Sequence, residues 1–249
     1  MTQELAGRVA LVTGAGRNIG RAIALALADA GAAVVINARS NLREAEAVAG
    51  EIERAGGKAF AVTADVVDAA AVQKMVEAAA ARFGRIDILV NNAAVRAEQP
   101  LETMTLADWR AVTGIILDGA FNCVKACLPH LKRCGAGAIV NIGGLSSHTG
   151  AARRPHVVTA KAGLLGFTRA LAHELAPDKI RVNTVTPGVM AQARPAGQPE
   201  PQHHAIVRSL VGRRGEPADI AAAVRFLCGP GASFITGQNI HVNGGMFLG

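Results

Sequence analysis

The chain has 249 residues, of which 50% are hydrophobic and 18% are charged, with 28 glycines, four cysteines and no tyrosine. This composition excludes a disordered chain, a collagen-like repeat and a small disulfide-stapled domain. It also excludes every mechanism that needs a tyrosine hydroxyl. The formal net charge is +7, but the basic residues are spread along the chain and only 3% of residues are aromatic. We therefore expect no nucleic-acid partner.

The first residues and the first long apolar stretch bear on location. Residues 1–7 contain Glu4 and lead directly into a strand-like run, so we expect no signal peptide. The apolar stretch 22–38 is interrupted by Asp29 and Gly31, which predicts a helix followed by a strand and no membrane span. These features favour a cytoplasmic, reducing location and no membrane partner.

Short apolar runs alternate with helical patterns along almost the whole chain. The runs predict strands at Arg8–Thr13, Ala33–Ala38, Lys58–Thr63, Ile86–Asn91, Ala138–Ile142 and Ile180–Thr186. The patterns between them predict helices at Arg21–Ala30, Leu42–Ala55, Ala69–Phe83, Leu106–Leu131, His156–Leu175 and Pro217–Leu227. Nearly continuous apolar strands are typical of parallel sheets covered on both faces. We predict one α/β domain over residues 1–249, a doubly wound Rossmann fold with a seven-stranded parallel sheet and helices on both faces.

Two stretches of this pattern need separate interpretation. Cys123, Cys127 and Cys134 are spaced along one helix face, where they cannot surround a metal ion, so we interpret them as a buried or interface stripe. Residues 190–211 are rich in proline and glutamine in their first part and follow a predicted strand. They form either a tolerated surface loop or a substrate lid. We favour the lid, because ligands bind at the carboxyl ends of strands in such sheets.

The first predicted strand runs into a glycine-rich segment that opens a helix. Gly14, Gly16 and Gly20 give the spacing G-x-G-x-x-x-G. Glycines permit a tight turn and let backbone N–H groups approach a pyrophosphate at the helix N-terminus. The spacing is one residue longer than the general dinucleotide fingerprint, so a glycine-rich turn without a ligand is the alternative.

The end of the second predicted strand indicates which dinucleotide would bind. An acidic residue there would bind the ribose 2′-hydroxyl of NAD, but the chain has Ala38 followed by Arg39 and Ser40. Arg17 in the first turn is a second cation. A guanidinium binds phosphate through a bidentate pair of hydrogen bonds, so the two arginines favour NADP(H) over NAD.

These motifs are joined by five others along the chain: Asp65-Val66, Asn91–Ala94, Lys161–Gly163, Val182–Gly188 and 212–246. With them, nearly the whole chain resembles the short-chain dehydrogenases/reductases, and among them the 3-oxoacyl-acyl-carrier-protein reductases. The resemblance implies a homotetramer or homodimer that acts on a small molecule, with the two long helices at the subunit interface. It implies cofactor contacts at Gly14, Arg17, Asn18, Ile19, Gly20, Arg39, Ser40, Asp65, Val66, Asn91, Ala93, Lys161, Pro187 and Gly188. Of these, Asp65 and Val66 would hold the adenine, and Pro187 and Gly188 would lie near the nicotinamide.

One cofactor position departs from the family pattern. The middle glycine of the family's first turn is replaced by Asn18. Because asparagine tolerates left-handed backbone better than most residues, we expect the turn to survive. The Asn18 side chain would intrude beside the pyrophosphate, so weaker cofactor binding is expected.

The resemblance fails at the catalytic positions. The family uses a tyrosine acid, a lysine four residues later, a serine thirteen residues before the tyrosine, and an asparagine on an earlier helix. Here Lys161 is present, but Val157, Gly144 and Ile116 stand at the other three positions, and Gln192 replaces a threonine expected near the nicotinamide. No shift of alignment restores a tyrosine that the chain lacks. We therefore expect ordinary ketone reduction to be close to negligible.

Other residues leave several functions open. His148 or His156 could supply a proton, but a loop and a helix surface are the simpler places for them, and His156 is rotated about 100° from Val157 on a helix. Lys161 could still bind the nicotinamide ribose. Three functions remain open. The first is an oxidoreductase with an altered site, for a substrate such as a cationic iminium ion. The second is a non-catalytic dinucleotide sensor or inactive partner subunit, and the third is a binder of another ligand with no cofactor.

Overall fold

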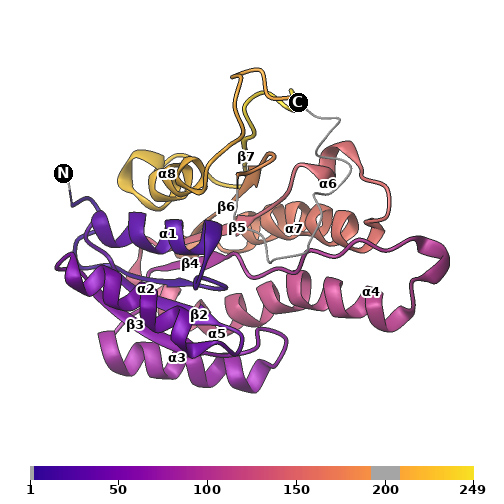
Figure 1. Ribbon diagram of the computed structural model, residues 1–249. Helices are drawn as coiled ribbons and strands as arrows, with labels where there is room; N and C mark the ends of the chain where they lie inside the picture. The colour runs from indigo at the N-terminus through magenta and orange to yellow at the C-terminus, as the bar shows by residue number, and fades with distance from the viewer. Residues whose placement is uncertain (1–2, 192–207) are drawn as a thin grey trace.

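The computed structural model describes residues 3–191 and 208–249 (Figure 1). Its centre is one sheet of seven strands in the order β3-β2-β1-β4-β5-β6-β7, and every neighbouring pair is parallel. The strands are β1 (Val9–Val12), β2 (Ala33–Ala38), β3 (Lys58–Thr63), β4 (Ile88–Asn91), β5 (Ala138–Ile142), β6 (Arg181–Pro187) and β7 (Asn239–Val242). The predicted doubly wound, seven-stranded parallel sheet is confirmed.

Helices join the strands in the predicted alternation. The main helices are α1 (Asn18–Asp29), α2 (Leu42–Arg54), α3 (Ala69–Phe83), α4 (Leu106–Thr113), α5 (Gly119–Cys134), α7 (Pro155–Glu174) and α8 (Pro217–Cys228). Two shorter ones are the π-helical turn η2 (Gly114–Asp118), which joins α4 to α5, and α6 (Ser146–Thr149). The predicted helix at Leu106–Leu131 is therefore one helical stretch that contains a π-helical turn.

Two hydrophobic cores lie on the two faces of the sheet. Alternate residues of β1 enter different cores: Ala10 and Val12 pack with α1, α2 and α8, whereas Val9 and Leu11 pack with α3, α5 and α7. Figure 1 shows α1 and α8 on one side of the sheet and α3 and α5 on the other. Because both faces are covered, both sets of strand side chains are apolar, which explains the continuous runs in the sequence.

The long helical stretch Leu106–Cys134 belongs to these cores. Among the described residues it is the one helix long and apolar enough to cross a membrane. One face of it, however, packs in the interior: Cys123, Cys127 and Leu131 are fully buried against the sheet. Burial raises the pKa of Cys123 to about 12 and that of Cys127 well above its usual value, so both remain neutral thiols. The stretch is a core helix, and its first two cysteines are buried as predicted.

The predicted lid lies largely outside the described residues. Of 190–211, the structure describes 190–191 and 208–211. Met190 pairs with Gly215 in a single β-bridge just after β6, and the Leu210 and Val211 side chains are exposed. The lid therefore stays a prediction.

Candidate functional site

The predicted cofactor residues lie at one edge of the sheet. Parallel strands end at the same edge, and β1 and β4 are neighbours at the point where the strand order reverses direction. Ligands of open α/β sheets bind at such a point. The predicted residues lie at or just after the ends of five strands. Gly14 follows β1, Arg39 and Ser40 follow β2, and Asp65 and Val66 follow β3. Asn91 ends β4 and is followed by Ala93, and Pro187 ends β6 and is followed by Gly188.

The turn after β1 has the close packing that a dinucleotide cradle requires. Gly14 has a φ of +60°, and a Cβ there would lie 3.1 Å from the Cα of Ala93. A Cβ on Gly20 would overlap the carbonyl oxygen of Gly14 and lie 2.8 Å from the Cα of Ala15. These glycines are therefore required for the close approach of α1 to the turn, independently of any ligand.

Asn18 takes the left-handed conformation that a glycine would otherwise provide. It is the first residue of α1 and has a φ of +50°. Asparagine visits this region at low cost because its short polar side chain can bond locally. The expectation that the turn survives the replacement is confirmed, and the helix N-terminus remains available to an anion. Ile19, next to it, is buried under the turn.

A hydrogen-bond network holds this turn against the end of β4. The Thr13 hydroxyl accepts from the main-chain N–H groups of Asn92 and Ala93, both at 3.0 Å. The Asn92 side-chain amide donates to the carbonyl oxygens of Thr13 (2.8 Å) and Gly14 (2.9 Å). Asn92 was not among the predicted site residues, although the Asn91-Asn92 pair was its signal. The network fixes the shape of the cradle before any ligand binds.

Asn91 points into the protein interior. Its side-chain amide donates to the Asn141 side chain at 2.9 Å, and the Asn141 amide donates to Thr168 of α7 at 2.8 Å. These bonds join β4, β5 and α7 behind the cradle. The Oδ1 atom of Asn91 is buried and has no hydrogen-bond partner among the described residues. It is an acceptor that a bound donor could satisfy.

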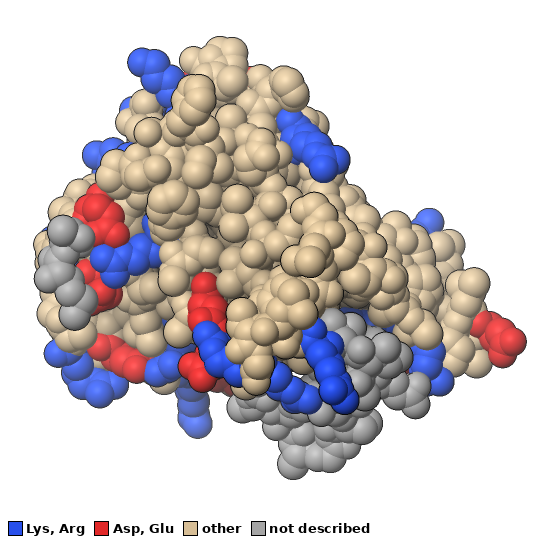
Figure 2. All heavy atoms as spheres, turned by 90° about the horizontal axis from the view of Figure 1, so that it is seen from above, with Lys and Arg blue, Asp and Glu red and all other residues tan. Residues whose placement is uncertain are grey.

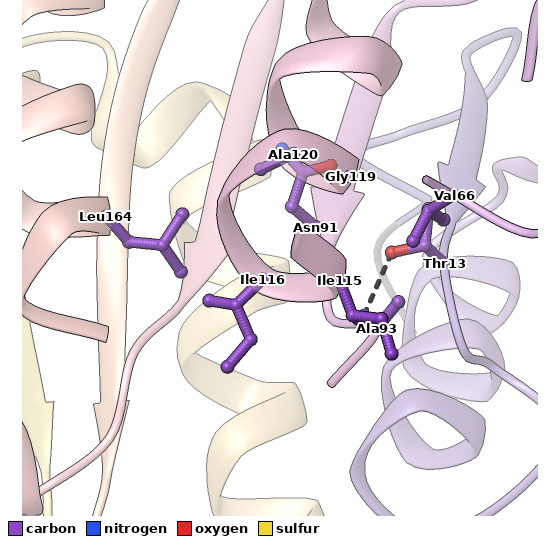
Figure 3. Close-up of a pocket in the computed structure, with 9 residues that line it drawn as sticks. All are labelled: Thr13, Val66, Asn91, Ala93, Ile115, Ile116, Gly119, Ala120 and Leu164. Carbon is purple, nitrogen blue, oxygen red and sulfur yellow. Dashed lines mark hydrogen bonds between the residues drawn. The ribbon is translucent and has the colours of Figure 1, made fainter. Parts of the chain in front are cut away.

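A small cavity adjoins Asn91 at the strand-order reversal (Figure 3). Figure 3 shows the Thr13–Ala93 hydrogen bond on one side of it and the side chains of Ile116 and Leu164 on the other. Its lining is mostly apolar: Thr13, Val66, Asn91, Ala93, Ile115, Ile116, Gly119, Ala120 and Leu164. The π-helical turn η2 thus contributes two isoleucine side chains to the floor of the site.

The two candidate phosphate-binding arginines are exposed. Arg17 precedes α1 and Arg39 follows β2, and neither side chain makes a hydrogen bond or ion pair with a described residue. Asp65 is half-buried, and its Oδ1 accepts from the Val67 N–H at 3.2 Å, while the side chain of Val66 is buried. The helix N-terminus at Asn18 and the two exposed cations are groups that can hold a phosphate at this edge.

Lys161 lies on α7 with its side chain 7% exposed. Its Nζ donates to the carbonyl oxygen of Ile142, the last residue of β5, at 2.5 Å. Burial, and after it the positive charges of Arg96 and Arg154, lower the pKa of Lys161 to about 8. At neutral pH the group is therefore a buried ammonium ion close to its titration point.

The positions expected to carry side-chain proton donors or polar anchors near Lys161 hold no such groups. Val157 of α7 and Ile116 of η2 are 5% and 2% exposed and belong to one hydrophobic cluster. The other buried members are Val112, Ala120, Ala160 and Leu164. Gly144, which follows β5, has no side chain at all, so none of the three positions offers a titratable proton.

His156 is not on the helix surface, and that expectation is wrong. Its side chain is 1% exposed on α7, a helix that packs against α4, and neither ring nitrogen makes a hydrogen bond to a described residue. Burial lowers its pKa. His148 is held elsewhere: Asn239 Nδ2 donates to Nε2 of both His148 (3.1 Å) and His241 (3.0 Å). This pairing commits His148 to a contact with β7.

Comparison with known proteins identifies the relatives of this chain. Residues 14–247 match the family model described as "Enoyl-(Acyl carrier protein) reductase". The chain is 40% identical over 240 residues to a 3-oxoacyl-[acyl-carrier-protein] reductase of Staphylococcus aureus, covering 96% of this chain and 98% of the relative. It is 41% identical over 249 residues to the enzyme of that name from Aquifex aeolicus, covering 99% and 100%.

Solved structures give the same relationship. A dehydrogenase/reductase from Sinorhizobium meliloti superposes with a TM-score of 0.92 at 37% identity, covering 99% of this chain and 98% of the other. A short-chain dehydrogenase/reductase mutant from Serratia marcescens gives 0.90 at 35% identity, covering 97% and 98%. Together with the parallel sheet and the cradle at its carboxyl edge, these matches show that the chain belongs to the short-chain dehydrogenase/reductase family of oxidoreductases and is similar to its 3-oxoacyl-acyl-carrier-protein reductases.

Proposed function

We propose that this protein is an NADP(H)-binding oxidoreductase of the family whose active site lacks the groups for tyrosine-dependent carbonyl reduction. The observation that carries the proposal is the contrast at the carboxyl edge of the sheet. The dinucleotide cradle around Gly14 and Gly20 is complete, whereas Val157 and Ile116 are packed together in a buried apolar cluster beside Lys161. This chain would thus keep the residues that hold the cofactor but lack the side chains that the family uses for proton transfer.

Oxidoreductases of this family use NAD or NADP, and two features support NADP. First, β2 ends at the buried Ala38, so no carboxylate directly follows the strand to bind a ribose 2′-hydroxyl. Second, Arg17 and Arg39 lie at the turns after β1 and β2, and their guanidinium groups have no partner among the described residues. A guanidinium pairs with a phosphate through two charge-assisted hydrogen bonds, which is the interaction that a 2′-phosphate requires.

Different residues of the chain would then bind different parts of the cofactor. Main-chain N–H groups at the start of α1 would bind the pyrophosphate, and Asp65 and Val66 would hold the adenine. Lys161 would bind the hydroxyls of the nicotinamide ribose, and Pro187 and Gly188 would lie against the nicotinamide. When bound, the cofactor supplies a hydride. The apolar cluster of Ile116 and Val157 would keep water away from the place where the hydride leaves.

The missing step is proton transfer. Hydride arriving at a carbonyl carbon leaves negative charge on the oxygen, which needs a hydrogen bond and then a proton. Losing a positioned general acid costs roughly 10²- to 10⁴-fold in rate. Losing a hydrogen bond to the developing oxyanion costs roughly 10²- to 10³-fold. Val157, Gly144 and Ile116 supply neither group, so ordinary ketone substrates are expected to turn over at close to the background rate.

Replacing either cofactor arginine tests the choice of cofactor. Arg17→Ala and Arg39→Ala are each expected to weaken NADPH binding by roughly 10- to 100-fold, since a hydrogen bond to a charged group contributes about 1.5–3 kcal/mol. NADH binding should change little, because NADH has no 2′-phosphate. Both are measured by fluorescence titration. Arg82→Ala, an exposed arginine at the end of α3, is the control and should change neither. Equal losses for NADPH and NADH would contradict the assignment.

We also propose that the protein self-associates as a homodimer or homotetramer and stays in the cytoplasm. Figure 2 looks onto the side that carries α8 and β7, where Lys and Arg lie around the margin and the centre is largely uncharged. Phe226 and Phe234 in this part of the chain are 50% and 103% exposed. Large exposed aromatic side chains favour burial against another copy. Light scattering of the purified protein is expected to give two or four chains per particle, and a monomer would contradict the proposal.

A further inference from the structure

A half-buried glutamate lies against the glycine-rich turn after β1. A Cβ built at Gly16 would lie 3.0 Å from the Cβ of Glu44 and 3.3 Å from its Oε2 atom. Glu44 belongs to the first turn of α2, where its main-chain N–H donates to the side chain of the N-cap residue Asn41. The absence of a side chain at Gly16 therefore leaves the room that the Glu44 side chain occupies, and the carboxylate lies beside the turn.

The same turn is joined to the end of β2. The Gly14 N–H donates to the side-chain oxygen of Asn37 at 3.3 Å, and the Ala15 N–H donates to the carbonyl oxygen of Asn37 at 2.8 Å. The turn after β1, the end of β2 and the start of α2 thus meet at one place. A dinucleotide on such a fold has its pyrophosphate at the turn and its ribose 2′-hydroxyl near the end of the second strand. The Glu44 carboxylate is therefore next to the expected position of this ribose.

The Glu44 carboxylate is not committed to another group. It makes no hydrogen bond or ion pair with a described residue. Arg17 directly follows Gly16, and Arg39 directly follows β2, but within the described part of the chain neither arginine pairs with Glu44. The site would thus offer a dinucleotide ribose two cations and one anion.

The two forms of the cofactor interact differently with these charges. An ionised carboxylate accepts hydrogen bonds and has none to donate. The 2′-hydroxyl of NADH can donate a hydrogen bond to it, whereas the negatively charged 2′-phosphate of NADPH is repelled. The two guanidinium groups act in the opposite sense, because they attract the phosphate. The cofactor preference of the chain is then the difference between two opposed effects.

We propose that Glu44 sets the cofactor preference of this chain by accepting a hydrogen bond from the ribose 2′-hydroxyl of NADH and by repelling the 2′-phosphate of NADPH. The inference rests on the proposed function, because it concerns the same dinucleotide site. The ribose carboxylate of dinucleotide-binding folds follows the second strand, and in this chain it comes from α2. Arg17 and Arg39 keep NADPH the tighter ligand, and Glu44 reduces the difference.

The test is a fluorescence titration of NADPH and of NADH, at about 20 mM salt, into the wild-type protein and into Glu44→Gln. The substitution keeps the size of the side chain, so its packing against Gly16 is retained, and removes the charge. NADPH is expected to bind about 5- to 30-fold more tightly, because the repulsion is lost. NADH is expected to bind about two- to fivefold more weakly, because a neutral acceptor makes a weaker hydrogen bond. Glu46→Gln, an exposed glutamate on α2, is the control and should change neither affinity.

The salt dependence of the difference between the two proteins gives a second measurement. Mobile ions screen the repulsion between exposed charges, over about 10 Å at 0.1 M and about 3 Å at 1 M. The gain in NADPH affinity of Glu44→Gln over the wild-type protein should therefore become smaller as salt is added. The loss in NADH affinity comes from a hydrogen bond and should persist. A gain for NADPH that does not fall with salt would contradict the repulsion.

The outcomes separate the two proposals. If the wild-type protein binds NADPH, but Glu44→Gln changes both affinities equally, changes neither or weakens NADPH, the role of Glu44 is wrong and the proposed function stands. If the wild-type protein binds no NADPH, the proposed function fails, and the titrations of Glu44→Gln decide the inference by themselves. NADPH binding gained in that variant supports the role of Glu44, and no gain overturns it.

Discussion

The double replacement Gly144→Ser, Val157→Tyr is expected to give NADPH-dependent reduction of a 3-oxoacyl thioester at least 10²-fold, and up to roughly 10⁴-fold, faster than the unmodified protein. The new phenol would stand one helical turn before Lys161, whose ammonium would lower its pKa and make it a usable acid. The new hydroxyl would add a hydrogen bond for the developing oxyanion. Steady-state oxidation of NADPH, followed by its absorbance, measures the rate.

The structure has room for a serine side chain at Gly144, whereas a tyrosine ring at Val157 would crowd its neighbours. A serine Cβ at Gly144 would meet Lys161 Cγ at ordinary contact distance, 3.7 Å. The larger ring in place of Val157 would overfill a packed cluster, which costs about 1–3 kcal/mol of stability, so thermal unfolding is measured alongside. The matched control carries Gly144→Ser with Val158→Tyr, which rotates the phenol about 100° away. Equal activity in the two double variants, or activity that persists when Lys161→Met is added, would contradict the account.

Gly20→Ala is expected to abolish detectable NADPH binding and to destabilise the protein. The added Cβ would overlap the carbonyl oxygen of Gly14 and lie 2.8 Å from the Cα of Ala15, and neither backbone atom can move aside without opening the cradle. Overpacking of this kind costs about 1–3 kcal/mol, which corresponds to a fall in Tm of roughly 2–4 °C per kcal/mol for a chain of this size. Fluorescence titration and thermal unfolding check the two effects.

Gly50→Ala provides the matched control. Gly50 lies within α2, and a Cβ there would have no neighbour within 4 Å. Alanine is more favourable than glycine in a helix by about 0.5–1 kcal/mol, so this variant should unfold at a slightly higher temperature and bind NADPH normally. Wild-type affinity for NADPH in Gly20→Ala would show that the close approach of α1 to the turn is dispensable, contrary to our interpretation of the cradle.

The fold was predictable because apolar strand runs and helical patterns can each be recognised within a short stretch of sequence and alternate along the chain. Each central strand of the sheet is buried on both faces, so runs such as Ala33–Ala38 are apolar almost throughout, and the helices between them have the ordinary helical pattern. The weakest point was β7, whose four residues are only half-buried at the sheet edge and leave no apolar run to recognise. The π-helical turn inside Leu106–Cys134 also leaves no periodic signal, because it adds a single wide turn.

The cradle was predictable in position but not in its supports. Gly14, Asn18 and Gly20 lie close together in the sequence, so their spacing indicated a turn. The bonds from Asn92 to Thr13 and Gly14 join residues 79 and 78 positions apart. No local pattern reports such a pairing, and the neighbouring Asn91 bonds to Asn141 in the interior. The assignment of cofactor contacts stays a prediction until binding is measured.

The surroundings of Lys161 needed three-dimensional information. The sequence showed that Val157, Gly144 and Ile116 lack useful protons, but not that two of them pack together, nor that Gly144 leaves room for a Cβ. A surface position was predicted for His156 because its place in one helix carries no information about what covers it, whereas the fold buries it to 1% exposure. The pKa of Lys161 depends on burial and on two arginines that only the fold brings near.

The central claim is that cofactor binding survives in a site without the family's proton donors. One preparation of the unmodified protein tests it: NADPH is titrated by fluorescence, and the same sample is then assayed for reduction of a 3-oxoacyl thioester. The account predicts saturable NADPH binding, tighter than that of NADH, with turnover no faster than the protein-free background. Turnover at the rate of a normal reductase, or no NADPH binding at all, would contradict it.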